Sequence, residues 1–185
     1  EYRRASSTCI DASLKPVMGP YLSALDESLR RSGFAGRILG VTSQGGVVDT
    51  AALAEAPIHA LNSGPALAPI SGRRFAAADA DAQTAIVTDS GGTSFDVTLV
   101  RAGEIPRTAE AWIGPEFNGH IIGFPAVEVS WIGAGGGSIA SVDAGGLLSV
   151  GPQSAGADPG PVCYGRGGDR PTVTDAALVL GYLDP

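Results

Sequence analysis

Residues 84–100 read Thr-Ala-Ile-Val-Thr-Asp-Ser-Gly-Gly-Thr-Ser-Phe-Asp-Val-Thr-Leu-Val and form the most informative run in the chain. Its first six residues predict a buried strand, and the alternation of Phe95, Val97 and Leu99 with polar residues predicts a second one. Residues 89–94 between the two strands predict a glycine turn. The sequence therefore predicts a β-hairpin with an acidic, glycine-lined tip.

The tip of this hairpin has the composition of a phosphate-binding turn. Gly91 and Gly92 are expected to take positive φ and to let a ligand approach, so that consecutive N–H groups converge on phosphate oxygens. Asp89 and Asp96 repel phosphate, but a carboxylate there can hold Mg²⁺ or its waters, or orient a nucleophile. An ordinary Gly-Gly hairpin with solvated acids has the same pattern, and these residues alone leave both interpretations open.

The composition limits the class of protein. The 185 residues are 44% hydrophobic and 17% charged, with 27 Gly and 13 Pro, which indicates a folded chain rich in turns. The net charge of −7 argues against nucleic acid or an anionic membrane as the main partner. Because no apolar run has the length of a membrane span and the start lacks a signal-type segment, a cytoplasmic location is expected. Cys9 and Cys163 predict neither a disulfide framework nor a zinc site, and buried or incidental thiols are expected.

The residues before the hairpin predict an alternation of helices and short strands. Apolar residues at helical spacing, with Pro16 near the start and Gly33 as a stop, predict a helix over about 16–32. A short strand over 38–41 follows. The pair Gly45-Gly46 after it is interpreted as a strand-to-helix turn, with ligand binding as the alternative.

Two further helices and two lone histidines come next. Asp49 is expected to cap a brief helix. A second helix is predicted to start at residues 62–65 and to reach about Ala78, with Pro69 kinking it or delaying its start. His59, in an apolar segment, is interpreted as structural. His120 is interpreted as a surface loop residue, with a ligand contact as the alternative.

The segment after the hairpin is predicted to be loop-rich from Gly103 to Phe124 and to form a strand over 127–132. It leads into three successive glycines, 135–137. Such a run carries an entropic cost in any fold, so a close backbone approach, to a ligand or to another strand, is the expected reason for it.

The end of the chain predicts a second hairpin, a loop and a closing helix. The hairpin spans 138–150, and the Pro- and Gly-dense stretch 151–171 is expected to be an ordered functional loop. Thr172 or Thr174 is expected to cap the closing helix. Four apolar residues of this helix are predicted to be buried: Ala176, Leu178, Val179 and Leu180.

Several motifs together resemble a known family. They are Asp-Ser-Gly-Gly-Thr-Ser-Phe-Asp-Val at 89–97, Ile-Gly-Ala-Gly-Gly-Gly-Ser-Ile-Ala at 132–140, the Pro- and Gly-rich run at 150–168, and Pro-Thr-Val-Thr-Asp-Ala-Ala-Leu-Val-Leu-Gly at 171–181. In this order, over nearly the whole chain, they are similar to the hydantoinase A / 5-oxoprolinase family. The resemblance implies an ATPase of the actin, sugar-kinase and heat-shock-chaperone fold that activates a cyclic amide or ketone with ATP.

The resemblance implies a fold class and a division of the chain. The expected class is α/β, an actin/sugar-kinase-like ATPase domain fragment with a mixed sheet, β-hairpins and flanking helices. Residues 1–80 would end the first ATPase lobe with its connecting helix, and residues 81–185 would form the second-lobe core with the phosphate hairpin and the Gly-rich loops. The family's first phosphate loop and its long C-terminal region have no counterpart here, and the chain opens on Glu1. We therefore expect a central fragment that is inactive in isolation.

The resemblance also implies roles for the site residues. Asp89 would hold Mg²⁺ through water or position the attacking group, and Asp96 would brace the turn or share the metal, so both are catalytic candidates. Arg166 would neutralise a phosphate or a substrate carboxylate, with an ion pair to Asp158 or Asp169 as the alternative. The residues expected to bind the nucleotide are Gly91, Gly92, Thr93, Ser94, Gly135, Gly136, Gly137, Ser138 and Arg166.

The implied reaction transfers the γ-phosphoryl group of ATP to a lactam, hydantoin or enolate oxygen, with magnesium as the second cofactor. The implied partners are a small cyclic amide or ketone substrate and, as in relatives, a hydrolytic partner subunit. The full-length protein is expected to form a homo- or hetero-oligomer, without nucleic acid or membrane partners. Two alternatives stay open at this point: a nucleotide-gated, chaperone-like module without enzymatic activity, and a structural or interaction domain.

Overall fold

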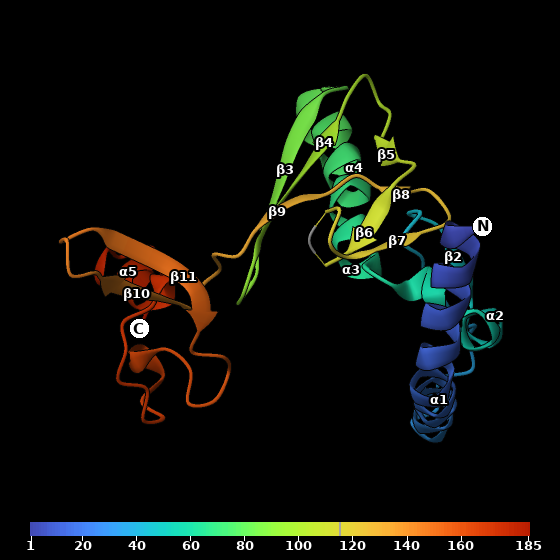
Figure 1. The fold of residues 1–185 in the computed structure, drawn as a ribbon, viewed down its shortest axis with the longest axis horizontal. Helices are drawn as coiled ribbons and strands as arrows, with labels where there is room; N and C mark the ends of the chain where they lie inside the picture. Colours follow the sequence, from blue (N-terminus) through green and yellow to red (C-terminus); the bar gives the residue numbers. More distant parts are fainter. Residues whose placement is uncertain (115) are drawn as a thin grey trace. The chain divides into compact units, whose positions relative to one another are not determined.

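The computed structural model describes residues 1–114 and 116–185, which fold into helices and several small sheets (Figure 1). The predicted α/β class is confirmed. The chain divides into two compact units, one formed by Glu1–Val87 and Leu99–Glu128 and the other by Thr88–Thr98 and Val129–Pro185. The tip of the predicted hairpin therefore belongs to the second unit.

The first unit combines one long helix with shorter helices and paired strands. Strand β1 pairs with β2, β5 with β8 and β6 with β7, each pair antiparallel. The elements of this unit are α1 (Tyr2–Arg31), β1 (Leu39–Val41), β2 (Val47–Asp49), α2 (Thr50–Glu55), η1 (Pro57–Ala60), α3 (Ser63–Ala66), α4 (Ala68–Ala80), β5 (Arg107–Thr108), β6 (Ala111–Ile113), β7 (His120–Ile122) and β8 (Ala126–Val127).

The N-terminal helix α1 is longer than its apolar periodicity indicates. The predicted start near Pro16 is wrong, because the helix begins at Tyr2 and continues through Pro16 and Pro20 to Arg31. The predicted stop is confirmed, since Gly33 takes a φ of +87° just beyond the last turn. Each internal proline lacks the N–H that the helix ladder uses, so contacts with other elements must offset that loss.

Three polar side chains supply such contacts along the first half of α1. Arg3, Ser7 and Asp11 are spaced four residues apart and therefore share one face of the helix. The Ser7 Oγ accepts the N–H of Gly123 at 2.8 Å, and the Asp11 Oδ1 accepts the N–H of Ile58 at 3.1 Å. A polar stripe has no apolar period, which explains why periodicity placed the helix start too late.

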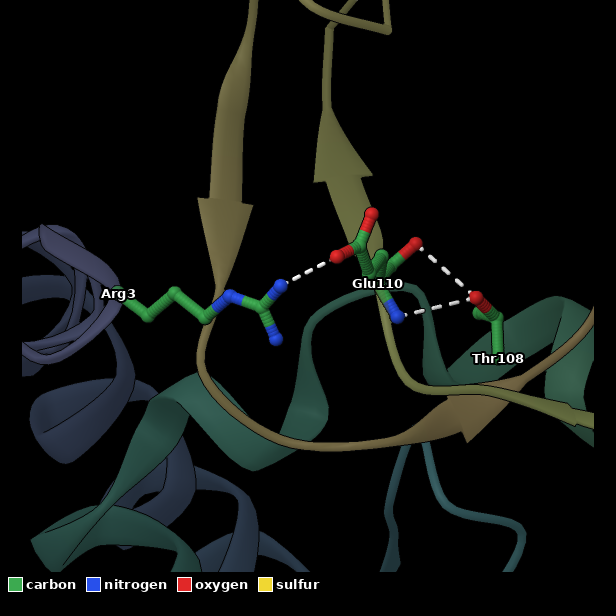
Figure 2. A network of polar contacts seen from close by, with 3 residues as sticks. All are labelled: Arg3, Thr108 and Glu110. Atoms are coloured by element: carbon green, nitrogen blue, oxygen red, sulfur yellow. Dashed lines mark hydrogen bonds and ion pairs between the residues drawn. The ribbon is translucent and has the colours of Figure 1, made fainter.

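The third contact, at the start of α1, is an ion pair to a residue far along the chain. Figure 2 shows the Arg3 guanidinium reaching the carboxylate of Glu110, next to β6. The hydroxyl of Thr108 fixes the backbone of Glu110, because it accepts the N–H of that residue and donates to its carbonyl, both at 3.1 Å. Helix α1 is thus joined to the 108–110 segment through Glu110, whose backbone is held by Thr108.

The short hairpin of β1 and β2 determines the positions of Gly45, Gly46 and Asp49. Gly45-Gly46 closes the hairpin of β1 and β2, so the interpretation as a strand-to-helix turn is wrong. Asp49 lies at the N-cap position of α2 as predicted, but its side chain makes no cap bond. The carboxylate instead pairs with Arg37 at 2.6 Å, because the hairpin brings the guanidinium within reach.

The predicted helix after residue 62 is divided in two. Helix α3 ends at Ala66, and Pro69 lies in the first turn of α4, where its missing N–H is not needed. The expectation that Pro69 delays the true helix start is confirmed. His59 stacks against Phe124 with ring centroids 4.8 Å apart, which agrees with a structural role.

The prediction that the stretch from Gly103 to Phe124 is loop-rich is only partly correct. It contains β5, β6 and β7, and His120 lies on β7 rather than in a loop. Strands of two or three residues are too short to show a period of two, so the sequence pattern could not reveal them.

The hairpin strands are β3 (Ala85–Ser90) and β4 (Phe95–Val100), which form a three-stranded sheet with β9 in the order β3-β4-β9. The prediction that the first strand is buried is wrong for one face, since the side chain of Ile86 is 73% exposed. The other face packs on α4. A Cβ added to Gly72 would clash with the Cγ2 of Val87, so glycine is needed for this close approach.

The second unit contains a second hairpin and a short closing helix. Strands β10 and β11 are antiparallel, as predicted, and α5 lies beside β10 (Figure 1). The predicted strand over 127–132 is divided between β8 and β9, so that prediction is only partly correct. The elements of this unit, besides the hairpin tip, are β9 (Ser130–Ile132), β10 (Ser138–Val142), β11 (Leu148–Ser154), η2 (Val162–Tyr164) and α5 (Val173–Val179).

The closing helix is capped by Thr172, one of the two predicted caps. The predicted burial of its four apolar residues is wrong, because no residue of this helix is buried, Ala176 is exposed, and Val179 and Leu180 are 86% and 67% exposed. A seven-residue helix presents less than two turns to its neighbours, so its last residues lie beyond the packed surface. None of the helices in the described part of the chain is long and apolar enough to cross a membrane.

The two units differ in what is buried. Apart from prolines, nearly all the buried hydrophobic side chains of the described residues belong to the first unit, and in the second unit Ile139 reaches this degree of burial, as does the proline Pro161. The members in the first unit are Leu22, Leu53, Ile58, Ala66, Val100, Ile121, Ile122, Ala126 and Val127. The second unit is therefore held together mainly by hydrogen bonds and close backbone contacts.

Helix α1 offers a matched pair of variants, at Asp11 in the polar stripe and at Asp26 outside it. Asp11 and Asp26 each pair with a basic residue four positions on, but Asp11 alone of the two accepts a backbone N–H from another element. Asp11→Ala leaves the part-buried N–H of Ile58 without its partner and should cost about 1–3 kcal/mol of unfolding free energy. Asp26→Ala should cost about 0–1 kcal/mol, as an exposed ion pair does. Urea denaturation of both variants measures the difference, and equal losses would contradict the role given to Asp11.

Candidate functional site

The candidate site is built on the turn of residues 91–94, which joins β3 to β4. The N–H of Gly91 donates to the carbonyl of Ser94 at 2.9 Å and closes the turn. The expectation of positive φ at Gly91 and Gly92 is wrong, because neither residue occupies the left-handed region. The turn closes with ordinary backbone angles, so its geometry alone does not require glycine there.

Gly92 has open space where a side chain would stand. A Cβ added to Gly92 meets no heavy atom within 4 Å, whereas one added to Gly91 approaches the Ser94 carbonyl oxygen at 3.3 Å. Within the described residues, neither backbone strain nor packing therefore explains why position 92 lacks a side chain. A ligand that approaches the backbone from solvent would explain it.

Two carboxylates flank the turn, one on each strand. Asp89 is exposed on β3, and Asp96 is half-buried on β4, where it is paired in register with Trp131 of β9. Neither carboxylate forms a hydrogen bond or ion pair within the parts of the chain that the structure describes, so the expected bracing of the turn by Asp96 is not observed. A carboxylate left open to solvent suits Mg²⁺, which keeps most of its waters and takes one or two protein oxygens.

The three successive glycines pack against the back of this turn. The N–H of Gly136 donates to the carbonyl of Gly91 at 2.9 Å, and the N–H of Gly137 donates to the carbonyl of Gly92 at 2.7 Å. A Cβ on Gly135 would lie 2.6 Å from the Gly91 carbonyl oxygen, closer than real side chains approach. The expected close backbone approach is confirmed, and its partner is the hairpin turn.

Ser138 closes the glycine run and is fully buried. Its Oγ accepts the N–H of Gly135 at 2.8 Å, and its own N–H donates to the Gly135 carbonyl at 3.0 Å. Gly135 and Gly137 are buried as well. Of the residues expected to bind nucleotide, the structure thus brings Gly91, Gly92 and the glycine run together, but it leaves only the hairpin side open to solvent.

Two residues that the sequence did not assign to the site support the glycine run from α5. Thr174 donates twice to the carbonyl of Gly136, through its N–H and its Oγ, both at 2.8 Å. Asp175 accepts the N–H and the hydroxyl of Thr172, both at 2.8 Å, and completes a capping box. The Thr-x-x-Asp spacing of 172–175 signals the capping box in the sequence, whereas the contact of Thr174 with Gly136 has no sequence signal.

The carboxylate of Asp175 also anchors the loop before α5. It accepts the N–H of Cys163 at 2.7 Å and that of Val162 at 3.2 Å. Burial opposes ionisation of Asp175, but the hydrogen bonds from Cys163 and Thr172 outweigh it and hold the pKa of this carboxyl well below its ordinary value. The hydrogen bond to Asp175 in turn raises the pKa of the Cys163 thiol.

The loop from 151 to 171 contains an exposed cysteine and an exposed arginine. Cys163 is exposed, as is Cys9, so of the two expectations for these thiols, buried or incidental, the first is wrong. Arg166 lies over the ring of Tyr164, with its guanidinium carbon 5.7 Å from the ring centroid. In the described part of the chain, Arg166 pairs with neither Asp158 nor Asp169, so its cation remains available to an anionic ligand.

Comparison with known proteins finds a family profile and relatives that are similar to nearly the whole chain. The family profile described as hydantoinase/oxoprolinase matches residues 4–185. The sequence is 45% identical to the caprolactamase subunit alpha of Pseudomonas jessenii over 183 residues, which is 99% of this chain and 26% of that protein. The chain thus spans about a quarter of the length of this relative.

Two solved structures have a similar fold. The crystal structure of the ATP-dependent caprolactamase from Pseudomonas jessenii matches with a TM-score of 0.74 and 45% identity, over 100% of this chain and 26% of that one. A nucleotide-free acetone carboxylase, described in a study of ATP-dependent acetone carboxylation, matches with a TM-score of 0.73 and 28% identity. That match covers 89% of this chain and 22% of the carboxylase chain.

The packing of the glycine run predicts different outcomes for two neighbouring glycines. Gly135→Ala places a methyl group against the backbone of Gly91 and should lower the unfolding free energy by about 1–3 kcal/mol, as overpacking does. Gly133 has open space and no positive φ, so Gly133→Ala should stay within about 0.5 kcal/mol of the wild type. Thermal melting of both variants tests this, and a neutral Gly135→Ala would argue against the close contact.

The lowered pKa of Asp175 predicts a dependence of stability on pH. An aspartate in the unfolded chain has a pKa of about 3.9. The stability that ionised Asp175 contributes is therefore complete at pH values well above it. It is lost as the pH falls below about 4 toward the lowered pKa of the folded state. The difference in melting temperature between wild type and Asp175→Asn should therefore be largest near neutral pH and shrink in acid. Asp169→Asn, in the loop before α5, controls for the loss of a charge, and a difference that does not vary with pH would contradict this prediction.

Proposed function

The chain belongs to the hydantoinase/oxoprolinase family, and on this premise we propose that it is part of an enzyme that uses ATP to activate a cyclic amide or a ketone. The caprolactamase and the acetone carboxylase that it resembles are both described as ATP-dependent, and they act on a lactam and a ketone. Both substrates carry a carbonyl oxygen that can accept a phosphoryl group, which makes the lactam oxygen a good leaving group and traps the ketone as its enol phosphate. The shared step is therefore transfer of the γ-phosphoryl group of ATP to the lactam oxygen or to the enolate oxygen of the ketone.

The observation that carries this proposal is the open turn at Gly92. The turn exposes backbone at a position where the described protein itself has no need of glycine, and two carboxylates lie on the strands beside it. Backbone N–H groups without a side chain in front of them are ready partners for phosphate oxygens. Gly91, Gly92, Thr93 and Ser94 are proposed to contact the β- and γ-phosphates.

The carboxylates supply the acidic side of the site. Asp89, which is exposed, is proposed to hold Mg²⁺ through water or to orient the attacking oxygen, and Asp96 to share that role from β4. When bound, the metal neutralises charge on the transferring phosphoryl group. Arg166, whose cation is available, would contact a phosphate or a substrate carboxylate. Catalysis then consists of positioning and electrostatic stabilisation, which is the general pattern of phosphoryl transfer.

The larger frame of the enzyme is also a proposal. Residues 1–80 would end the first lobe of an actin-like ATPase, and residues 81–185 would form the core of its second lobe. The caprolactamase relative is named as a subunit, which supports an assembly with a partner chain, such as a hydrolytic subunit. A cytoplasmic location fits a reaction that consumes ATP, and this chain alone is expected to lack ATPase activity.

The role of Asp89 is tested by removing its charge in the full-length protein. Asp89→Asn keeps the size of the side chain but removes the negative charge that the metal or the transition state uses, so ATP turnover with a small lactam as co-substrate should fall about a hundredfold or more. The melting temperature should barely change, because the carboxylate is exposed and without a partner in the described residues. Asp79→Asn, an exposed acid on α4, is the matched control and should retain full turnover. Full activity of Asp89→Asn at saturating Mg-ATP would exclude the assignment of the hairpin as the phosphate site.

A further inference from the structure

We propose that Thr174 is a positioning residue for the phosphate-binding turn, acting through the carbonyl of Gly136. This inference rests on the proposed function, since it concerns the orientation of backbone groups that would meet phosphate. It assigns a role in nucleotide binding to α5, a helix that contributes no residue to the turn itself. Three steps lead from the turn back to this helix.

The first step is the orientation of the peptide groups in the turn. The carbonyls of Gly91 and Gly92 both point at the glycine run, because they accept the N–H groups of Gly136 and Gly137. In a planar trans peptide the N–H points opposite to the carbonyl, so the N–H groups of Gly92 and Thr93 are turned away from the run. Neither N–H has a hydrogen-bond partner within the described residues. The contact thus leaves two donors without a protein partner, as an anion site requires, and of the two the Thr93 nitrogen lies against Gly135, where an added Cβ would stand 2.6 Å from it.

The second step is the support behind the glycine run. The peptide of Gly136 is held between the turn on one side and α5 on the other, since its N–H reaches Gly91 and its carbonyl accepts both donors of Thr174. A Cβ on Gly136 would lie 2.8 Å from the Thr174 Oγ, so the contact leaves no room for a side chain. Any displacement of Thr174 therefore shifts the peptide that fixes the Gly91 carbonyl.

The third step is the rigidity of Thr174 itself. The residue lies inside the capping box formed by Thr172 and Asp175, in which each side chain binds the backbone of the other. Asp175 also accepts N–H groups from Val162 and Cys163, so the loop before α5 is tied to the same carboxylate. The start of α5 is consequently a fixed base, and Thr174 transmits its position to the turn.

The decisive experiment uses the full-length protein and measures binding of Mg-ATP by calorimetry together with hydrogen exchange of the peptide that covers residues 88–98. Thr174→Val keeps the shape and the backbone N–H but removes the hydroxyl donor. It should raise the Kd of Mg-ATP about three- to tenfold, the effect expected from one hydrogen bond, and should speed exchange in residues 88–98. Thr174→Ser keeps the hydroxyl and should restore both values, and Thr174→Ala serves as a second hydroxyl-free variant if the valine is poorly accommodated.

A control separates positioning from general stability. The carboxylate of Asp143 accepts the N–H groups of Gly145 at 2.8 Å and Leu147 at 3.0 Å in the turn between β10 and β11, within the same unit. Asp143→Ala should lower the melting temperature without changing the Kd of Mg-ATP. If Asp143→Ala weakens binding as much as Thr174→Val does, the effect is one of stability and the positioning proposal is overturned.

A reference variant separates this proposal from the function it rests on. Gly92→Val fills the open space at the turn and should weaken binding of Mg-ATP if the hairpin contacts phosphate. If Gly92→Val weakens binding and Thr174→Val does not, the positioning role is wrong while the proposed function stands. If neither variant changes the Kd, the turn is not the phosphate site, and both proposals are overturned.

Discussion

The structure of the candidate site depends on one backbone contact, the packing of Gly135, Gly136 and Gly137 against the turn at Gly91 and Gly92. Two hydrogen bonds join the runs at 2.9 and 2.7 Å, and no side chain separates them. A methyl group at Gly135 would stand 2.6 Å from a carbonyl oxygen, so the sequence of the run is dictated by distance rather than by backbone angles. Everything that the turn can do for a ligand follows from the orientation that this contact imposes.

The contact matters more because the second unit buries little apolar surface. Hydrophobic burial is not directional, so a unit such as the first can adjust its packing when one side chain changes. Hydrogen bonds between backbone groups are directional and lose strength quickly when their geometry changes. The second unit therefore gains a defined arrangement of peptide groups around the turn, but that arrangement is sensitive to a single added carbon atom.

The residues of the site divide into those that meet solvent and those that orient them. The tip at Gly92 and Thr93 and the carboxylate of Asp89 are exposed to solvent. The residues behind the tip form their hydrogen bonds with other groups of the protein; they are Ser138, Thr174 and Asp175. A carboxylate with a lowered pKa is ordinarily a candidate for catalysis, but Asp175 owes its lowered pKa to hydrogen bonds from the backbone and side chains of Cys163 and Thr172, and it serves as an anchor.

The amino-acid sequence by itself determined the features that arise from neighbouring residues. The hairpin around Gly91, the helix stop at Gly33, the break at Pro69 and the capping box at Thr172 follow from turn chemistry, backbone angles and caps, which act over a few residues. The sequence also predicted a close approach by the backbone of residues 135–137, either to a ligand or to the backbone of another strand. Only the tertiary structure decided which backbone that is, that α1 begins at Tyr2, and that Thr174 supports the turn. Each of these rests on a contact between residues distant in the chain, and such a contact leaves no periodic or local pattern in the sequence.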